Sequence, residues 1–159
     1  MAIDRAELRR VMGHFATGVT VITTRDRNGK PYGLTANAVC SVSLAPPLLL
    51  VCVDKSAESH PAFVQSRLFA INILGDEHEA LSRRFAVSGG DKFVDVPFRS
   101  GVTGLPLLEG VLAVVECRVV DVHEAGDHTI FIGEVEGLES AEGDPLLFFR
   151  GKYRRLGAD

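Results

Sequence analysis

The stretch LTANAVCSVSLAPP, residues 34–47, carries the most informative pattern in the chain. Alternate side chains of an extended strand share a face, so one face here would be small, apolar and suited to a core. It comprises Ala36, Ala38, Cys40, Val42 and Leu44. The other face would carry Thr35, Asn37, Val39, Ser41 and Ser43. Strand faces turned to water usually include Lys, Glu or Arg, and this face has none. Its short hydroxyl and amide groups fit either contact with a polar ligand or a polar strand edge in a turn-rich segment.

The composition around this stretch is that of one globular domain spanning residues 1–159. The chain is 46% hydrophobic and 24% charged, with a formal charge of −4, which argues against nucleic-acid binding. No apolar run approaches the ~18 residues of a membrane span, and the start MAIDRAELRR lacks the apolar segment of a secretory signal. Cys40, Cys52 and Cys117 are too widely spaced for a metal or redox pair, and Cys52 and Cys117 are expected in the core. A cytoplasmic location is expected.

Further out, short strands dominate. Residues 17–36 form a predicted hairpin around Asn28-Gly29, and PPLLLVCVD (46–54) is too continuously apolar for an exposed edge. RLFAINIL (67–74), two long strands around Gly126 within 111–140, and one short strand in PLLFFRGKYRRL (145–156) are also predicted. The order is not an alternation of strands and helices, so the fold class is mainly β, with short helices and antiparallel strands closing into a barrel.

Three short helices interrupt the strands. The first starts near Asp4, with Glu7 completing a capping box and Leu8, Val11, Met12 and Phe15 at helical spacing. The second is SHPAFVQS (59–66), with Pro61 in its first turn. The third is DEHEALSRRFA (76–86), capped by Asp76. Residues 87–110, rich in glycine and proline, are expected to be irregular and therefore functional or mobile.

Several catalytic motifs are absent. The chain has no G-x-G-x-x-G after a strand and no G-x-x-x-x-G-K-[ST]. HEALS starts like a zinc-protease helix but has Ser82 where the second His belongs, and the five histidines have no ligand spacing. A hydrolase is therefore poorly supported, and no metal site is expected.

Five ordered blocks carry a family resemblance: FATGVTVITT, GLTANAVCSVSLAPPLLLVCVDKSAESHP, FAINIL, GDHTIFIGEVEGL and PLLFFRGKYRRL. Together, over residues 9–156, they resemble the flavin reductase-like family, the small reductase components of two-component flavin monooxygenases. The resemblance implies a homodimeric split β-barrel that binds FMN or FAD. It also implies NADH or NADPH as hydride donor, and a partner monooxygenase that receives the reduced flavin. One departure is Ala45, where an Asp is common.

The resemblance also implies a set of flavin-binding residues. Thr35, Asn37 and Ala38 would line the ring and ribityl chain, and Ser41, Val42 and Ser43 would lie nearer the phosphate. Ala36 is a further cofactor-binding residue. Uncharged polar groups meet a flavin's carbonyls and N–H groups without burying an unpaired charge. The remaining candidates for the flavin site are Asp54, Ser56, Ala57, Ser82, Arg83, Phe85, Lys92, Phe93, Tyr153 and Arg155.

Each of these has a structural alternative. Ser56 or Ser59 could cap the next helix, Arg83 could complement a helix dipole, and Lys92 and the basic C-terminal residues could be solvated. His128, in AGDHT, is expected on the nicotinamide side of the site, or else at a solvated turn tip.

The implied reaction is hydride transfer from nicotinamide to flavin, which needs orientation by the protein but no side-chain acid or base. Three alternatives remain open. They are a flavin-binding module without turnover, a barrel that binds other proteins, and an enzyme that keeps its flavin and reduces another acceptor. FMN is not distinguished from FAD, nor NADH from NADPH. A homodimer is expected because strands such as VLAVVECRVV need cover.

Overall fold

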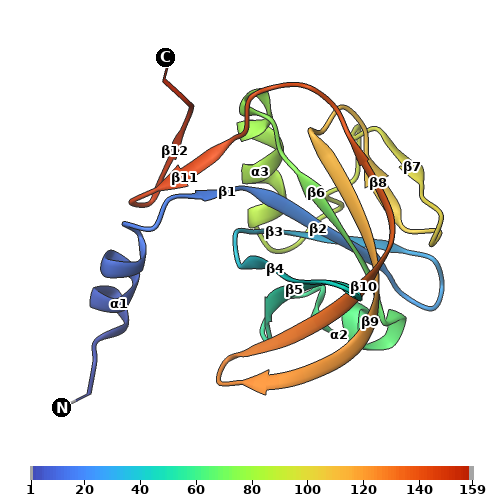
Figure 1. Cartoon of the computed structure of the whole chain (residues 1–159), viewed down its shortest axis with the longest axis horizontal. Coiled ribbons are helices and arrows are strands. Elements are labelled where there is room, and N and C mark those ends of the chain that lie inside the picture. The colour runs from blue at the N-terminus through green and yellow to red at the C-terminus, as the bar shows by residue number, and fades with distance from the viewer. Residues whose placement is uncertain (1, 158–159) are drawn as a thin grey trace.

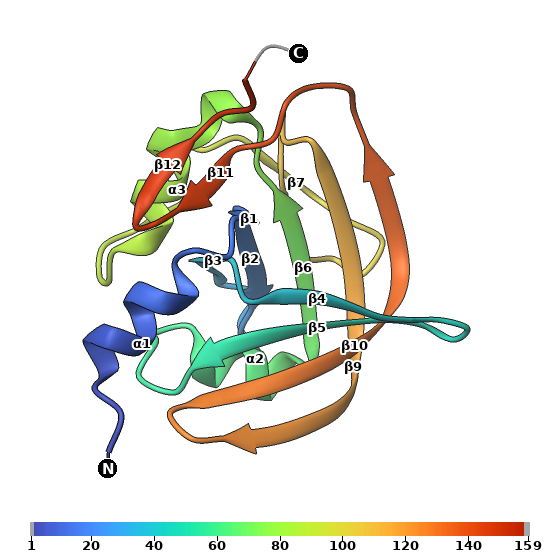
Figure 2. The same cartoon turned by 60° about the vertical axis from the view of Figure 1, so that its left-hand side comes forward.

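The computed structural model describes residues 2–157, and its main element is a strongly curved antiparallel sheet (Figures 1 and 2). Seven strands form it in the order β3-β2-β6-β9-β10-β5-β4. Their bounds are β2 (Thr20–Arg25), β3 (Pro31–Ala36), β4 (Val39–Leu44), β5 (Pro47–Asp54), β6 (Leu68–Ile73), β9 (Ala113–Ala125) and β10 (His128–Ser140). The predicted fold class, a mainly β split barrel, is confirmed.

Smaller elements flank this sheet. A three-stranded sheet joins β1 (Thr17–Gly18), β11 (Leu147–Phe149) and β12 (Lys152–Arg154), and a hairpin joins β7 (Phe98–Ser100) and β8 (Pro106–Leu108). The helices are α1 (Arg5–Met12), α2 (His60–Ser66) and α3 (Glu79–Ala86), the last preceded by the 3₁₀ turn η1 (Asp76–His78). The β11–β12 hairpin lies beside α3 and connects to α1, since Arg150 N–H donates to Gly13 O at 2.8 Å (Figure 2).

The two edge strands of the large sheet, β3 and β4, are consecutive in the chain. Only Asn37 and Ala38 separate them, yet in the part of the chain described they share no ladder, and each pairs on one side only, with β2 and with β5. The sheet therefore curls until its edges meet at this two-residue link without closing. We call this place the seam (residues 35–43).

The prediction that one continuous apolar face runs through residues 34–47 was wrong, and the seam explains why. The strand breaks at Asn37 and Ala38, so the alternation changes phase there. Ala36 and Val39 pack against the core, whereas Cys40, Val42 and Leu44 are exposed, Leu44 by 91%. Side chains of a strand project from the faces of the sheet, and within residues 2–157 no element buries these three side chains of β4.

Two apolar cores lie on opposite faces of the central strands. Val21 and Ala70 point to one core together with Phe85 of α3, while Ile22 and Phe69 point to the other. Because neighbouring side chains of a strand alternate, β2 and β6 are covered on both faces. This explains why VITT is buried without any break. Cys117 is buried as expected, which raises the pKa of its thiol to about 12, and Cys52 is half-buried.

The local turn and strand predictions were mostly correct. The Asn28-Gly29 hairpin forms, with Gly29 at a φ of 83°, and Gly126, at 63°, turns β9 into β10. Both glycines adopt the left-handed conformation that other residues enter at a cost. β5 lies between β10 and β4, so the prediction that it is not an edge strand is confirmed.

Four details of the sequence prediction were wrong. Glu7 forms an ion pair with Arg10 instead of a capping box, and no side chain caps α1. Asp76 lies inside the turn η1 rather than capping the third helix. Residues 145–156 form two short strands, not one, because the chain reverses at Arg150 and Gly151. The segment 87–110 is not wholly irregular, since it contains the β7–β8 hairpin.

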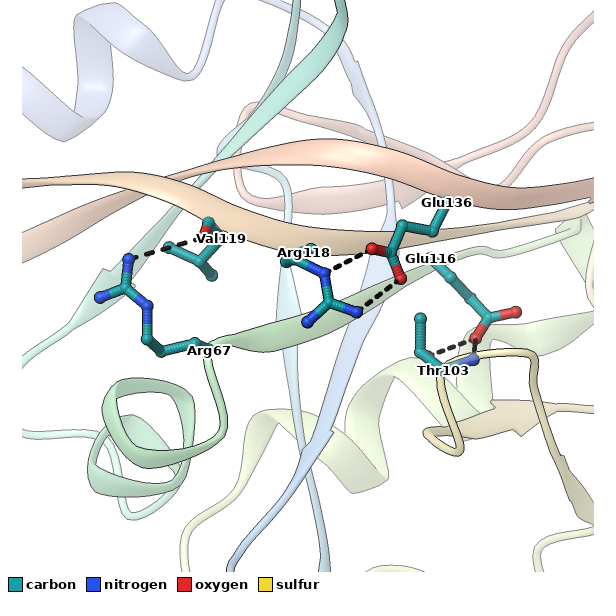
Figure 3. Close-up of polar contacts among 6 residues, drawn as sticks. All are labelled: Arg67, Thr103, Glu116, Arg118, Val119 and Glu136. Carbon is teal, nitrogen blue, oxygen red and sulfur yellow. Dashed lines mark hydrogen bonds and ion pairs between the residues drawn. The ribbon is translucent and has the colours of Figure 1, made fainter.

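A buried carboxylate fixes the turn after β7. Glu116 of β9 is only 3% exposed. It accepts hydrogen bonds from the backbone N–H groups of Val102 (3.1 Å) and Thr103 (2.9 Å) and from the Thr103 hydroxyl. Nearby, Arg118 pairs with Glu136 across β9 and β10, and Arg67 reaches Val119 O (Figure 3). The turn is thus fastened to the large sheet by polar contacts.

Candidate functional site

One group of the predicted site residues lies where β5 ends and β10 begins. Asp54 and His128 are directly paired across these strands. Asp54 Oδ1 accepts hydrogen bonds from the backbone N–H and the hydroxyl of Ser56, at 2.8 and 2.7 Å, and these bonds lower the pKa of Asp54. Ala57 packs against the core. Ser59, not Ser56, is at the N-cap of α2 and makes no side-chain cap bond.

His128 belongs to this group and is not at the tip of the turn. It is the first residue of β10 and half-buried, and its Nδ1 is 2.7 Å from Asp127 Oδ1. That contact lowers the pKa of Asp127. His60 lies behind the group, with Nε2 2.8 Å from the Thr129 hydroxyl. The ring of His128 is therefore oriented by a carboxylate while part of it stays accessible to a ligand.

A second group is built on α3 and β12. The Ser82 hydroxyl is buried and lies 2.7 Å from the Tyr153 hydroxyl. The Thr35 hydroxyl donates to Ser82 O at 2.5 Å. The Arg83 guanidinium lies 4.8 Å from the centroid of the Tyr153 ring and pairs with Glu79. These contacts hold the C-terminal hairpin against α3 and connect both to β3.

Phe85, Lys92 and Phe93 extend this second group. Phe85 packs so closely on Gly33 of β3 that a Cβ at Gly33 would lie 2.7 Å from its ring. Lys92 Nζ donates to Gly33 O (3.4 Å) and Phe85 O (3.3 Å), and burial lowers its pKa. Phe93 meets Phe85 edge-on at 5.1 Å. Lys92 is thus half-buried and bonded to two backbone carbonyls.

The seam lies between the two groups. Asn37 is exposed and donates from Nδ2 to the Thr17 hydroxyl at 3.1 Å. Ala38, Ser41 and Val42 are exposed as well, and the hydroxyl of the half-buried Ser43 accepts from Ala45 N–H. Thr35 connects the seam to α3, and Ala38 O accepts from Cys52 N–H two residues before Asp54. The seam thus presents neutral polar groups between a carboxylate–histidine end and an arginine–tyrosine end.

Arg155 is not part of this arrangement. Its Nε lies 3.9 Å from Asp76 Oδ2 beside η1, beyond the last strand. Sequence reasoning also missed two neighbours of the site, Thr17 and His60. Thr17 lies in the FATGVTVITT block and His60 opens α2 at the end of the block GLTANAVCSVSLAPPLLLVCVDKSAESHP. Both blocks carry the family resemblance, but neither residue stands out in them as a neighbour of the site.

Within residues 2–157 no group of three His, Cys, Asp or Glu side chains has a geometry that could hold a metal ion. None of the helices described is both long and apolar enough to cross a bilayer.

The structure is thus a curved, unclosed antiparallel sheet whose seam carries uncharged polar side chains and lies between a carboxylate–histidine group and an arginine–tyrosine group. Residues 12–157 match the family model described as flavin reductase like domain. The chain therefore belongs to the flavin reductase-like family.

Named relatives match nearly the whole chain. The reductase component of 4-nitrophenol 4-monooxygenase/4-nitrocatechol 2-monooxygenase from Rhodococcus opacus is 44% identical over 151 residues, covering 95% of this chain and 80% of the relative. SmoA from Agrobacterium fabrum, an FMN reductase (NADH), is 44% identical over 148 residues, covering 93% and 84%. Some relatives are longer, and the chain spans 48% of one from Rhizobium meliloti.

Solved structures share the fold. The NADH:FAD oxidoreductase SgcE6 from Streptomyces globisporus, solved with NAD and FAD fragments, superposes with a TM-score of 0.93 at 42% identity, covering 98% of this chain and 94% of that one.

Proposed function

We propose that this protein is an NAD(P)H-dependent flavin reductase that reduces FMN or FAD and supplies the reduced flavin to a partner monooxygenase. The observation that carries the proposal is the seam, where uncharged hydrogen-bonding side chains lie exposed between two separately anchored groups. A flavin ring needs donors and acceptors along its edge and no buried charge, and the exposed Asn37 and Ser41 fit this demand. The named relatives, which include reductases of FMN and of FAD and a monooxygenase component, support the same function.

When both are bound, the nicotinamide supplies a hydride and the flavin accepts it, with a proton from solvent completing the reduced flavin. The residues of this chain bind and orient. Thr35, Asn37 and Ala38 would hold the ring, with Ala36 behind them. Ser41, Val42 and Ser43 would serve the phosphate end together with the turn at Asp54, Ser56 and Ala57. Ser82, Arg83, Phe85, Lys92, Phe93 and Tyr153 would shape the opposite wall.

His128 would position the nicotinamide. Its ring is held by Asp127 and lies beside Asp54, so one ring nitrogen is oriented while the other remains for a carboxamide or phosphate. We assign no role to Arg155 at the ring, since Asp76 is its partner. The proposed cytoplasmic location rests on the three free cysteines.

The function is tested by steady-state kinetics with FMN and FAD, each against NADH and NADPH. We expect nicotinamide oxidation to depend on added flavin. Tight flavin binding without turnover would indicate a binding module instead, and absence of flavin binding would contradict the proposal altogether. Turnover that is independent of added flavin, with the flavin retained on gel filtration, would indicate an enzyme that reduces another acceptor.

Replacing His128 by Ala is expected to raise KM for the nicotinamide with little change in flavin affinity. The loss of one hydrogen bond, about 0.5–1.5 kcal/mol if neutral and about 1.5–3 kcal/mol if charge-assisted, lowers kcat/KM by a few-fold to about a hundredfold. Both constants should be measured on the same preparation. His123→Ala, a histidine elsewhere on the same hairpin, is the control. An unchanged KM, or a defect confined to flavin binding, would remove this role from His128.

We also propose that the protein is a homodimer. The reason first drawn from VLAVVECRVV needs correction, because Val114, Cys117 and Val119 of that segment are buried within the chain. Of that segment only Val120 is among the exposed large apolar residues, at 46%, whereas several such residues gather on β4 and on α1, which buries no residue. On α1 and the turn after it the exposed side chains are Leu8, Val11, Met12 and Phe15, and on β4 they are Val42 and Leu44.

Sedimentation equilibrium is expected to give twice the chain mass. Leu44→Asp should shift the protein toward the monomer, because an unpaired carboxylate at an apolar contact loses its hydration. Leu138→Asp, at another exposed leucine, is the control. A wild-type protein that sediments as an active monomer would refute the dimer.

A further inference from the structure

A cavity of about 480 Å³ lies at the turn between β2 and β3, far from the seam. Residues 25–29 form one wall, and Ser66 and Leu68, from the link between α2 and β6, form the other. Its volume is within the range of about 300–1,000 Å³ that is usual for small-molecule sites. Figure 1 shows this turn at the end of β2 and β3 opposite to their link with β4. Five strand residues, about 17 Å, separate Thr20 at the seam end of β2 from Arg25 at the cavity.

Arg25 brings a positive charge to this cavity without a carboxylate partner. The side chain is half-buried, and no Asp or Glu among residues 2–157 forms an ion pair with it. Its Nη2 donates to Thr103 O at 3.5 Å, which uses one of the five N–H donors of the guanidinium. Removing an unpaired charge from water costs free energy, so arginines that lose solvent are usually paired. The unpaired guanidinium therefore indicates an anion from outside the chain.

The guanidinium of Arg25 is held in place by the turn at residues 101–104. A Cβ at Gly104 would lie 2.9 Å from Nη1 and 3.0 Å from Nη2, so a side chain at this position would collide with the guanidinium. The turn itself is fixed by Glu116 through the backbone N–H groups of Val102 and Thr103. A planar fork that is already held loses little conformational entropy when it binds a ligand. Arg25 is thus suited to binding an oxyanion through two parallel hydrogen bonds.

Other donors lie in the same wall. Arg27 and Asn28 are exposed on the turn, so the guanidinium of one and the amide of the other can move toward a ligand. The Ser66 hydroxyl is half-buried and makes a long contact to Leu68 O, at 3.4 Å. A ligand oxygen at normal hydrogen-bond distance would be a better partner for this hydroxyl. The cavity therefore has several donors for one anionic group.

The carboxylate in the wall is Asp26, and the turn uses it internally. Its Oδ1 accepts from the backbone N–H groups of Asn28, at 2.8 Å, and Lys30, at 2.9 Å. These bonds set the shape of the turn on which Arg27 lies. Asp26 does not pair with Arg25, since neighbouring side chains of a strand point to opposite faces. The positive charge at the cavity therefore remains without an internal counter-ion.

We propose that this cavity binds the phosphate group of a small molecule, held mainly by the fixed guanidinium of Arg25. The further donors are Arg27, Asn28 and Ser66. A carboxylate has only two oxygens for these donors, whereas a phosphate has three or four. The cavity is larger than a phosphate group alone, so it has room for a small organic substituent beside Leu68. The site is separate from the proposed reaction, because the whole length of β2 lies between the cavity and the seam.

Calorimetric titrations with inorganic phosphate, glycerol 3-phosphate and acetate, at constant ionic strength, test the proposal. We expect the wild type to bind both phosphates and to bind acetate about tenfold more weakly or less. Tighter binding of glycerol 3-phosphate than of inorganic phosphate would identify a phosphate ester as the ligand, and the reverse would identify the free ion. Arg25→Gln should weaken phosphate binding about ten- to a hundredfold, because charge-assisted hydrogen bonds are lost. FMN affinity, measured by fluorescence titration, should not change.

Control variants separate binding from folding. Arg25 contacts the turn at Thr103, so the thermal midpoint of Arg25→Gln is measured without ligand. Arg27→Gln changes an exposed side chain and should weaken phosphate binding about three- to tenfold at an unchanged midpoint. Arg5→Gln removes the same charge from α1 and should leave phosphate affinity unaltered. If Arg25→Gln does not fold, the comparison of Arg27→Gln with Arg5→Gln decides.

Four results would overturn the proposal. The first is a wild type that binds no phosphate in the millimolar range, and the second is a folded Arg25→Gln variant with wild-type phosphate affinity. The third is an equal loss of phosphate affinity in Arg27→Gln and Arg5→Gln, which would show a general effect of charge. The fourth is a parallel loss of FMN and phosphate affinity in Arg25→Gln, because Arg25 would then belong to the flavin site.

Discussion

Replacing Asn37 by Leu is expected to weaken flavin binding by roughly a hundredfold or more. Asn37 lies at the link between β3 and β4, exposed and bonded through its amide nitrogen to Thr17. A leucine there removes the amide, adds bulk to the surface on which the flavin ring would lie, and leaves a polar ligand edge without a partner. Because the side chain is not part of either core, the fold should be retained. Flavin affinity is measured by fluorescence titration, together with the midpoint of thermal unfolding.

Two variants make this result interpretable. Ser140→Leu introduces the same side chain at an exposed serine at the far end of β10 and should leave flavin affinity unchanged. Asn37→Ser keeps a small polar group and should bind flavin better than Asn37→Leu. A folded Asn37→Leu protein whose dissociation constant lies within about twofold of the wild type would show that the seam is not the flavin surface.

Replacing Glu116 by Ala should lower the free energy of unfolding by about 2–4 kcal/mol. The substitution leaves two backbone N–H groups and one hydroxyl in the turn at residues 102–103 without their hydrogen-bond acceptor. It also leaves a cavity under the turn. Urea denaturation measures the loss. Flavin affinity should change much less than stability, since Glu116 has no contact with the seam residues.

The matched control is Glu134→Ala, an exposed glutamate on β10, which should change stability by no more than about 0.5 kcal/mol. Glu116→Gln should fall between the two, because its amide retains one acceptor oxygen in the right place. If Glu116→Ala and the wild type were equally stable, water molecules would be replacing the carboxylate as hydrogen-bond acceptors for the turn without loss of stability.

The positions of most strands along the chain could be predicted from turn residues and continuous apolar runs. Both act on the local backbone, so no distant part of the chain has to be known. Asn28-Gly29 and Gly126 need no distant partner to bend the backbone. The phase of the alternation along residues 34–47 could not be read this way. It depends on a break at Asn37-Ala38 that arises only when the two sheet edges meet, and a slip of one position exchanges the two faces.

In the candidate site, too, local features could be predicted from the sequence, whereas contacts between distant segments could not. The sequence brought out the polar character of Asn37 and Ser41, since the absence of charge is visible in the letters. It could not reveal that Ser82 bonds Tyr153, 71 positions away, or that Arg155 pairs with Asp76 beside η1. Glu116 was missed because a glutamate between Val115 and Cys117 in a strand looks like a solvent-facing position. Its burial is decided by the turn that folds over it.

The seam also has a kinetic consequence. In a closed barrel, a ligand held between strands leaves only when backbone hydrogen bonds break, and its residence time then follows the local opening of the sheet. Within residues 2–157, β3 and β4 share no such bonds, so a ligand on the seam can dissociate while every strand pair stays intact. Its off-rate is then set by its own contacts alone. Such a surface favours brief occupancy and repeated exchange over permanent retention.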